Sequence, residues 1–419
     1  MSAPLGGLSG WRDPSVLAAG GLALAAGFAQ FGVTTVLAEV ATAFGRSPPG
    51  DGVAAEVGMA ATQLGIGLAI IRLASLASLP VAGIADRVGR RRVALTCAAA
   101  GLGVTALGAL SPTFWVFVAT IAVARPLLTG TFSVANVIAA EETHVGSRAA
   151  AIALVGAAYS LGSGIVAVTR GITGGALGFR GVLLMALVPL ALIPLLGRAM
   201  RETPRFSAIE AGVVRHRLGA VPRPFVGRLA LLSVLAVVLG FVVGPVFTYL
   251  FVYGEGVLGE TPGRMAWLVL AAGPIGLIGL LIGRFGADRI GRRSMAAFST
   301  FVVGLGGLIA YRGSFAALAA GYLIVIAAAA AFTPSGGALG AELFPTSVRA
   351  TAAGWLSATG VLGSVTGLAT FGVLADELGS FAEAATLMSF PALLAAGLYM
   401  TLPETRGRDL EETAPEPES

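Results

Sequence analysis

Long apolar runs, separated by short charged or polar stretches, cover almost the whole chain. Each run is about 20 residues long, and an α-helix of that length crosses the hydrocarbon core of a bilayer, which is about 30 Å thick. A helix also satisfies its own backbone hydrogen bonds, as lipid requires. The pattern predicts twelve membrane-spanning helices, at about residues 15–40, 57–82, 93–111, 114–139, 149–170, 180–198, 229–252, 263–285, 295–311, 315–339, 350–374 and 381–402.

The composition supports a membrane protein. Of the 419 residues, 56% are apolar and 12% are charged, whereas soluble domains carry about 25% charged residues. A soluble protein of this length would need more charged side chains to cover its surface. We therefore expect an all-α membrane protein with twelve transmembrane helices, located in the inner or plasma membrane of the cell.

The ionisable residues exclude several kinds of active site. All 27 basic residues are arginines, so the chain lacks the lysine that Walker-type phosphate loops and Schiff-base cofactors need. Cys97 is the only cysteine, and together with His144 and His216 it is too little for a disulfide or a structural zinc site. No nucleophile, base and orienting group stand out together. The sequence predicts neither an enzyme nor a bound cofactor or metal.

The arginines also predict the orientation of the helices. If both termini are cytoplasmic, twenty arginines lie in cytoplasmic segments and five lie outside, which is the bias of the positive-inside rule. The five outside are Arg46, Arg170, Arg180, Arg264 and Arg312. Residues 199–228 form the longest basic stretch and divide the predicted helices six from six. We interpret this stretch as a cytoplasmic segment between two halves and not as a nucleic-acid site.

The sequence contains an internal repeat with an offset of about 202 residues. Three features recur: the stretch from Ala85 to Arg91, a glutamate seven residues before an arginine, and a Glu-Thr pair after the sixth helix. They are found at 85–91 and 287–293, at Glu141 with Arg148 and Glu342 with Arg349, and at Glu202-Thr203 and Glu404-Thr405. Because each half has an even number of spans, both halves enter the membrane from the same side and the repeat is parallel.

The repeat predicts the organisation of the chain into bundles. We expect an N-terminal six-helix bundle at 1–198, followed by the cytoplasmic inter-half segment at 199–228. A C-terminal six-helix bundle is expected at 229–402, and a cytoplasmic acidic tail at 403–419. The tail has too few apolar residues to form a core of its own.

These motifs resemble those of the major facilitator superfamily over nearly the whole chain. The loop at 83–92 matches the signature loop of that superfamily between spans 2 and 3, and 286–293 matches its copy between spans 8 and 9. The stretches 201–206, 342–349 and 403–412 are similar to motifs of the sugar-porter and metabolite-symporter branches. The resemblance implies two six-helix bundles that rock about a central cavity, with the substrate bound near mid-membrane.

The charged residues of the repeat predict a cytoplasmic gate. Asp86 closes span 2, and the glycine turn after it allows the arginines to bend towards carboxylates and lipid phosphates. We predict that these charges hold the two bundles together while the transporter faces outward; the alternative is that the arginines only anchor the topology. The predicted gate residues are Asp86, Arg87, Gly89, Arg90, Arg91, Glu141, Glu142, Arg148, Asp288, Arg289, Gly291, Arg292, Arg293, Glu342 and Arg349.

Polar residues inside the predicted spans are candidates for the substrate path, because burying them in a membrane is costly. Arg125 lies about twelve residues into span 4, roughly 18 Å along the helix and near the bilayer centre. An arginine there needs an acidic partner, a group of carbonyls or an anionic substrate. Arg72 in span 2 is a second such arginine. The predicted cavity residues are Gln30, Gln63, Arg125, Asn136, Tyr159, Thr248, Tyr249, Trp355 and Thr359.

The residues of span 1 leave coupling to protons open. Many proton-coupled members of the resembling branches carry an acid in this span. This chain has Gln30 at that depth, and Glu39 lies about 13 Å further towards the outside. The coupling candidates are Glu39, Arg125 and Arg72; without a coupling group the protein would be a uniporter or an exchanger.

The expected function is secondary transport of a small polar organic solute, such as a sugar, polyol or small carboxylate, by alternating access. The alternative within the same class is efflux of drugs or hydrophobic metabolites, which the missing acid of span 1 favours. A membrane receptor is a third alternative, and the short polar ends of the chain argue against it. The expected partners are the solute, membrane lipids and, if transport is coupled, protons; we expect a monomer that binds no nucleic acid.

Overall fold

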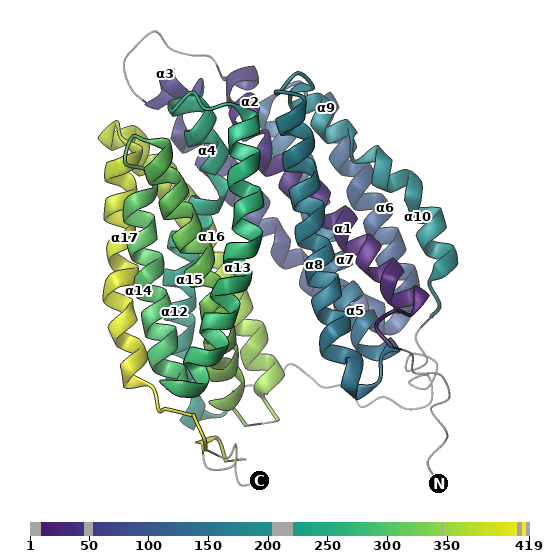
Figure 1. Cartoon of the computed structure of the whole chain (residues 1–419), viewed down its shortest axis with the longest axis vertical. Helices are drawn as coiled ribbons and strands as arrows, with labels where there is room; N and C mark the ends of the chain where they lie inside the picture. Colours follow the sequence, from purple (N-terminus) through teal and green to yellow (C-terminus); the bar gives the residue numbers. More distant parts are fainter. Residues whose placement is uncertain (1–9, 46–52, 203–220, 346, 409–412, 416–419) are drawn as a thin grey trace. The chain divides into compact units, whose positions relative to one another are not determined.

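The structure of the chain is a computed structural model that describes residues 10–45, 53–202, 221–345, 347–408 and 413–415. Within these residues the regular structure is helical, without strands (Figure 1). Twelve helical segments are long and apolar enough to cross a membrane, which confirms the number of predicted spans. They are Pro14–Thr35, Ala61–Ala85, Arg90–Leu110, Phe114–Glu142, Ser147–Ile172, Gly178–Ala199, Arg223–Thr248, Pro262–Arg289, Arg292–Ala310, Phe315–Glu342, Thr351–Leu378 and Phe381–Thr401.

The chain folds into two compact units. The first unit consists of residues 1–40 and 74–215, and the second of residues 41–73 and 216–419. The units therefore differ from the sequence halves over residues 41–73, which precede the inter-half segment but pack with the second unit. The predicted span at 57–82 is divided between the units, and a 3₁₀ turn, η1 (Ser75–Ser78), interrupts its helix close to the boundary.

The first unit contains α1 and the helices from α5 to α10. Their bounds are α1 (Pro14–Thr35), α5 (Leu79–Val88), α6 (Arg90–Leu107), η2 (Gly108–Leu110), α7 (Phe114–Glu142), α8 (Val145–Ile172), α9 (Gly178–Leu184) and α10 (Leu187–Ala199). The first helix ends earlier than the predicted span, since the chain turns at Val36 and continues as α2 (Leu37–Phe44). The buried core lies where α1, α6, α7 and α8 meet.

The second unit contains α3, α4 and all helices after the inter-half segment. Their bounds are α3 (Val53–Val57), α4 (Ala61–Ala74), α12 (Arg223–Thr248), η3 (Val252–Val257), α13 (Pro262–Arg289), α14 (Arg292–Ala310), α15 (Phe315–Glu342), α16 (Arg349–Leu378), α17 (Phe381–Leu398) and η4 (Tyr399–Thr401). Its largest buried cluster joins α12, α14, α15, α16 and α17.

Small residues allow one pair of helices in each unit to cross at close range. In the first unit α1 packs along α8, and a Cβ atom on Gly27 or Gly162 would overlap the backbone of the facing helix. In the second unit α12 packs along α16, where Gly363 and Gly367 lie directly against the backbone of α12. Membrane helices depend on such close packing, because lipid supplies no hydrophobic force between them.

Several helices begin at a hydroxyl residue that satisfies one of the free amides of the first turn. Thr113, Thr261, Ser314 and Ser380 accept hydrogen bonds from the amide three residues later and so cap α7, α13, α15 and α17. Helices α6 and α14 begin differently. Each follows a glycine, Gly89 or Gly291, that offers no capping side chain.

Candidate functional site

The turn between α5 and α6 brings a distant carboxylate to the start of a helix. Gly89 has a φ of +111°, a left-handed value that favours glycine. The amides of Arg90 and Arg91 donate to Glu202 Oε1 at 2.8 and 3.1 Å. A Cβ atom on Gly89 would lie 2.7 Å from Glu202 Oε2. The glycine therefore provides both the turn and the space for a carboxylate. This carboxylate caps α6 and lies at the positive end of its dipole, where a negative charge is stabilised.

Two arginines of this turn hold neighbouring helices of the first unit. Arg90 is buried, and its Nε lies 3.1 Å from Glu141 Oε2 near the end of α7. Arg91 donates from Nε to the Met200 carbonyl at 2.9 Å and from a terminal nitrogen to the Gly197 carbonyl at 2.7 Å. The turn thus connects α6 to the ends of α7 and α10 within one unit.

The second unit repeats this arrangement. Gly291 has a φ of +105°, and the amides of Arg292 and Arg293 donate to the Glu404 carboxylate at 2.9 and 3.3 Å. Arg292 Nε lies 2.8 Å from Glu342 Oε2 at the end of α15. Arg293 donates to the carbonyl of Leu402 at 3.0 Å. Glu202 and Glu404 were visible in the sequence only as part of the repeat, and their capping role was not predicted.

Glu404 accepts four backbone amides among the described residues. Besides Arg292 and Arg293, the amides of Thr405 and Arg406 donate to Oε1 at 3.1 Å each. Burial opposes ionisation, but the amides, those of Arg292 and Arg406 first, prevail and lower the pKa of Glu404 below its ordinary value. Glu404 is therefore held as a carboxylate at neutral pH.

The remaining predicted gate residues divide into those with partners in their own unit and those at the surface. Arg148 and Arg349 each donate from Nε to a carbonyl eight residues earlier, that of Ala140 at 3.0 Å and that of Ala341 at 2.7 Å. Glu142 is buried at the end of α7. Arg87, Asp288 and Arg289 are exposed. The side chain of Asp86 lies outside the described part of the structure.

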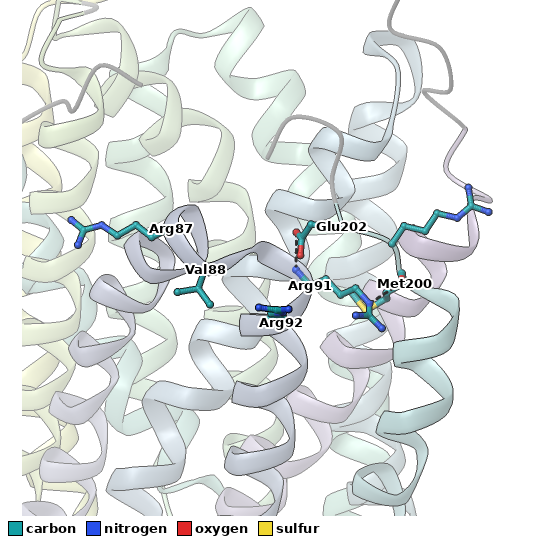
Figure 2. Close-up of a pocket in the computed structure, with 7 residues that line it drawn as sticks. Arg87, Val88, Arg91, Arg92, Met200 and Glu202 are labelled. Carbon is teal, nitrogen blue, oxygen red and sulfur yellow. Dashed lines mark hydrogen bonds between the residues drawn. The ribbon is translucent and has the colours of Figure 1, made fainter. Parts of the chain in front are cut away.

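A pocket of about 700 Å³ opens beside the arginine turn of the first unit. Figure 2 shows Arg91 extending towards Met200, Glu202 bonded to the backbone at Arg91, and Arg87 directed away from both. Its lining residues are Arg87, Val88, Arg91, Arg92, Met200, Arg201 and Glu202. Four arginines and one glutamate line the pocket, so its lining carries net positive charge and favours anionic groups.

The predicted substrate path of the first unit centres on Arg125. This residue is half-buried on α7, and its buried Nε has no hydrogen-bond partner among the described residues. Tyr159 on α8 lies within electrostatic range of it and contacts the Phe132 ring at a centroid distance of 4.7 Å. Asn136 donates to the Phe132 carbonyl of its own helix at 2.9 Å. Gln30 is buried on α1.

The predicted residues of the second unit lie in two places. Tyr249 is fully buried, and its hydroxyl donates to the Ala61 carbonyl at 3.2 Å. Gln63 on α4 and Thr248 on α12 are half-buried. Trp355 is 57% exposed, and the Thr359 hydroxyl donates to the Trp355 carbonyl at 3.0 Å. The last two residues therefore share one turn of α16.

The second unit also contains an apolar pocket of about 350 Å³ that none of the predicted residues line. It is formed by α12, α15, α16 and Tyr399, with Ser357 as the other hydroxyl-bearing side chain. Gly240, Gly336 and Gly360 contribute to the pocket by leaving space between the helices. These three glycines were the features of the sequence that could have indicated this pocket.

The coupling candidates have different environments. Arg170 is buried and donates to Glu39 Oε1 from a terminal nitrogen at 2.6 Å and from Nε at 3.1 Å. Glu39 thus belongs to an ion pair that the sequence did not predict, since its partner lies 131 residues away. Arg72 lies in the last turn of α4. Among the described residues, no three His, Cys, Asp or Glu side chains are grouped so that they could hold a metal ion.

Solved structures with a similar fold are membrane transporters. The chain superposes on the xylose transporter XylE from E. coli in an inward open conformation with a TM-score of 0.76, at 16% identity, covering 95% of this chain and 98% of that one. A bacterial homolog of the human lysosomal transporter Spinster gives 0.72 at 16% identity, covering 96% and 97%. The nucleoside transporter NupG gives 0.72 at 14% identity, covering 92% and 99%. At these identities the likeness concerns the fold alone.

The sequence itself identifies the family. No curated protein sequence matches the chain. The family model described as Major Facilitator Superfamily matches residues 19–287 and 258–418, and so covers both halves of the repeat. Twelve membrane-length helices, the repeated glycine-arginine turn and this match agree, and the chain belongs to the Major Facilitator Superfamily.

Proposed function

We propose that the protein is a secondary transporter that moves a small polar organic solute with an anionic group, such as a small carboxylate, by alternating access. The observation that carries this proposal is Arg125, whose buried Nε lacks a hydrogen-bond partner among the described residues. A guanidinium in this position costs free energy unless a ligand compensates it. Arginine also suits carboxylates, because its planar fork can bind both oxygens.

Tyr159 supports the same site. It lies within electrostatic range of Arg125, and its ring contacts Phe132, so a cation, a phenol and an aromatic surface are found on the neighbouring helices α7 and α8. A solute with one carboxylate and a small organic body matches this combination, since pockets for small molecules pair apolar walls with a few polar groups. Transporters of similar fold carry xylose or nucleosides, which are also small and polar.

The arginine turns of both units, in this proposal, lie on the cytoplasmic side of the cell membrane and form part of the gate. Each turn is assembled within its own unit by Glu202 or Glu404. The exposed arginines Arg87 and Arg289 are then the side chains available to interact elsewhere. Glu39 is paired with Arg170, which favours a structural role for this acid over proton transfer. This leaves uniport or exchange as the simplest mode of transport.

A thermal-shift screen of the purified protein in detergent tests the proposal, because a ligand that binds the native state raises its melting temperature. We expect stabilisation by a small carboxylate and, in Arg125→Ala, binding weaker by on the order of 100-fold, as for loss of a buried charged contact. Arg264→Ala is the control, since Arg264 is 56% exposed. Stabilisation by hydrophobic cations alone, unchanged in Arg125→Ala, would contradict the proposal and favour efflux.

A further inference from the structure

The first turn of α4 is capped by a carboxylate from a helix more than 300 residues away. Asp376 lies two residues before the end of α16, and its Oδ1 accepts from the Ala61 amide at 2.9 Å. Its Oδ2 accepts from the Thr62 amide at 2.7 Å. These amides have no partner inside their own helix. Both carboxylate oxygens are therefore used, and the negative charge faces the positive end of the α4 dipole.

Other contacts bring α4 against the same two helices. The Tyr249 hydroxyl at the end of α12 donates to the Ala61 carbonyl at 3.2 Å. A Cβ atom on Gly65 would lie 2.6 Å from the Leu368 carbonyl oxygen, and one on Gly372 would overlap the Ala61 carbonyl. The backbones of α4 and α16 thus touch, with glycine on both sides of the contact.

The side of this contact formed by α12 and α16 is closely packed. Tyr249 lies in a cluster of rings, 4.9 Å from Phe371 and 6.0 Å from Phe381 between centroids. Tyr311 lies 5.1 Å from Phe371, and its hydroxyl donates to the Pro245 carbonyl at 3.1 Å. Buried rings with satisfied hydroxyls hold one arrangement. Movement at this contact is therefore expected from α4.

Helix α4 has two attachments with different consequences. Through η1 the chain joins it to α5 of the first unit, whereas its packing belongs to the second unit. Alternating access requires the two sequence halves to separate at the end remote from the arginine turns. Asp376 is at that end, because α16 starts at Arg349, beside the arginine-rich end of the second unit, and runs away from it.

We propose that Asp376 and Tyr249 form an outer latch, which holds α4 to α12 and α16 and must release before the transporter opens at that end. The inference rests on the proposed alternating-access function. The charge of Asp376 is essential to it, since a neutral amide offers one acceptor oxygen where the carboxylate offers two. Asp376 is thus a positioning residue, which sets the balance between conformations without touching the solute.

A single-cysteine reporter tests the latch. The one native cysteine, Cys97 in α6, is replaced by serine, and Leu64→Cys places a thiol on the buried face of α4. Its rate of reaction with a membrane-impermeant maleimide reports opening at this end. Asp376→Asn should raise that rate about tenfold, the effect of losing a helix cap, and Tyr249→Phe should raise it less.

The control is the neighbouring acid Glu377, which is exposed on the same helix. Glu377→Gln removes the same charge without touching the cap and should leave the rate unchanged. Equal rates in Asp376→Asn, Glu377→Gln and the parent would overturn the latch. Melting temperatures show whether each variant is folded, and Tyr249→Phe still tests the latch if Asp376→Asn is not. The two proposals can fail separately. If no carboxylate stabilises the protein but Asp376→Asn raises the rate of the maleimide reaction, the proposed solute is refuted and the latch is supported.

Discussion

The arginine turns of the two units have the same plan, and the structure describes the chain beyond the capping carboxylate in the second unit. In both, a glycine with positive φ precedes a helix whose first amides bind a glutamate, Glu202 or Glu404. In the first unit a pocket of about 700 Å³ remains beside the glutamate. In the second, the chain after Glu404 folds back, and Arg406 donates to the Arg289 carbonyl. The shared part secures the helix ends in both units, whereas the chain beyond the glutamate can be followed only in the second, because residues 203–220 lie outside the described part of the structure.

Features present in one half alone are therefore the better candidates for specific function. An offset of 201 or 202 from Arg125 leads to Ile326 or Ala327, neither of which carries charge. The same offset before Asp376 leads to Gly174 or Gly175. A duplicated fold keeps what both copies need for stability, so the unmatched Arg125 and Asp376 point to solute binding and to conformational control.

The largest effect is expected from substituting the glycine that precedes the helix in each arginine turn. Gly89→Ala or Gly291→Ala should lower the free energy of unfolding by about 2–3 kcal/mol, because a Cβ atom is strained at positive φ and meets the glutamate. Gly83→Ala is the control, since Gly83 lies within α5 with open space around it. Denaturation in detergent measures the difference. Equal stability of Gly83→Ala and both turn variants would show that the turns are not strained by a side chain.

A smaller effect, dependent on pH, is expected at the carboxylates. Glu404→Gln should destabilise by about 1–2 kcal/mol at pH 7, because Glu404 accepts the amides of Arg292, Arg293, Thr405 and Arg406. The folded-state pKa of Glu404 is lowered from 4.5. Its stabilisation is therefore complete above that value and is lost as the pH falls through the folded pKa.

Melting temperatures of wild type and Glu404→Gln across this range measure the effect. The difference between the two proteins should be constant from pH 7 to about 5 and should shrink below about 4. A difference that grew on acidification would mean that the carboxylate is not stabilised by the amides around it.

Much of the fold could be predicted from the sequence, because its signals are local or periodic. Apolar length predicted all twelve spans, and the offset between 85–91 and 287–293 predicted two related halves. The contacts that assemble the sites are not local. Arg170 binds Glu39 across 131 residues and Asp376 binds Ala61 across 315. No periodicity fixes such a register, so these partners emerged only from the packing of the helices.

The sequence predicted only part of the candidate site, because local signals mark single residues but not their distant partners. The position of Arg125 within an apolar run marked it as a candidate, and its buried Nε has no hydrogen-bond partner among the described residues. The sequence grouped Glu141 with Arg148 by spacing, whereas the structure pairs Glu141 with Arg90. Helix α4 packs in the second unit although its sequence precedes the inter-half segment, and Gly65 of α4 lies against Leu368 and Gly372 of α16.

Transport by purified protein in liposomes tests the central claim most directly. Liposomes loaded with a small carboxylate are diluted into the same radiolabelled carboxylate, and exchange is compared for wild type, Arg125→Ala and the Arg264→Ala control. We predict exchange by wild type and by the control, and a loss on the order of 100-fold in Arg125→Ala. Equal exchange by wild type and Arg125→Ala would contradict the assignment of Arg125 as the residue that binds the solute.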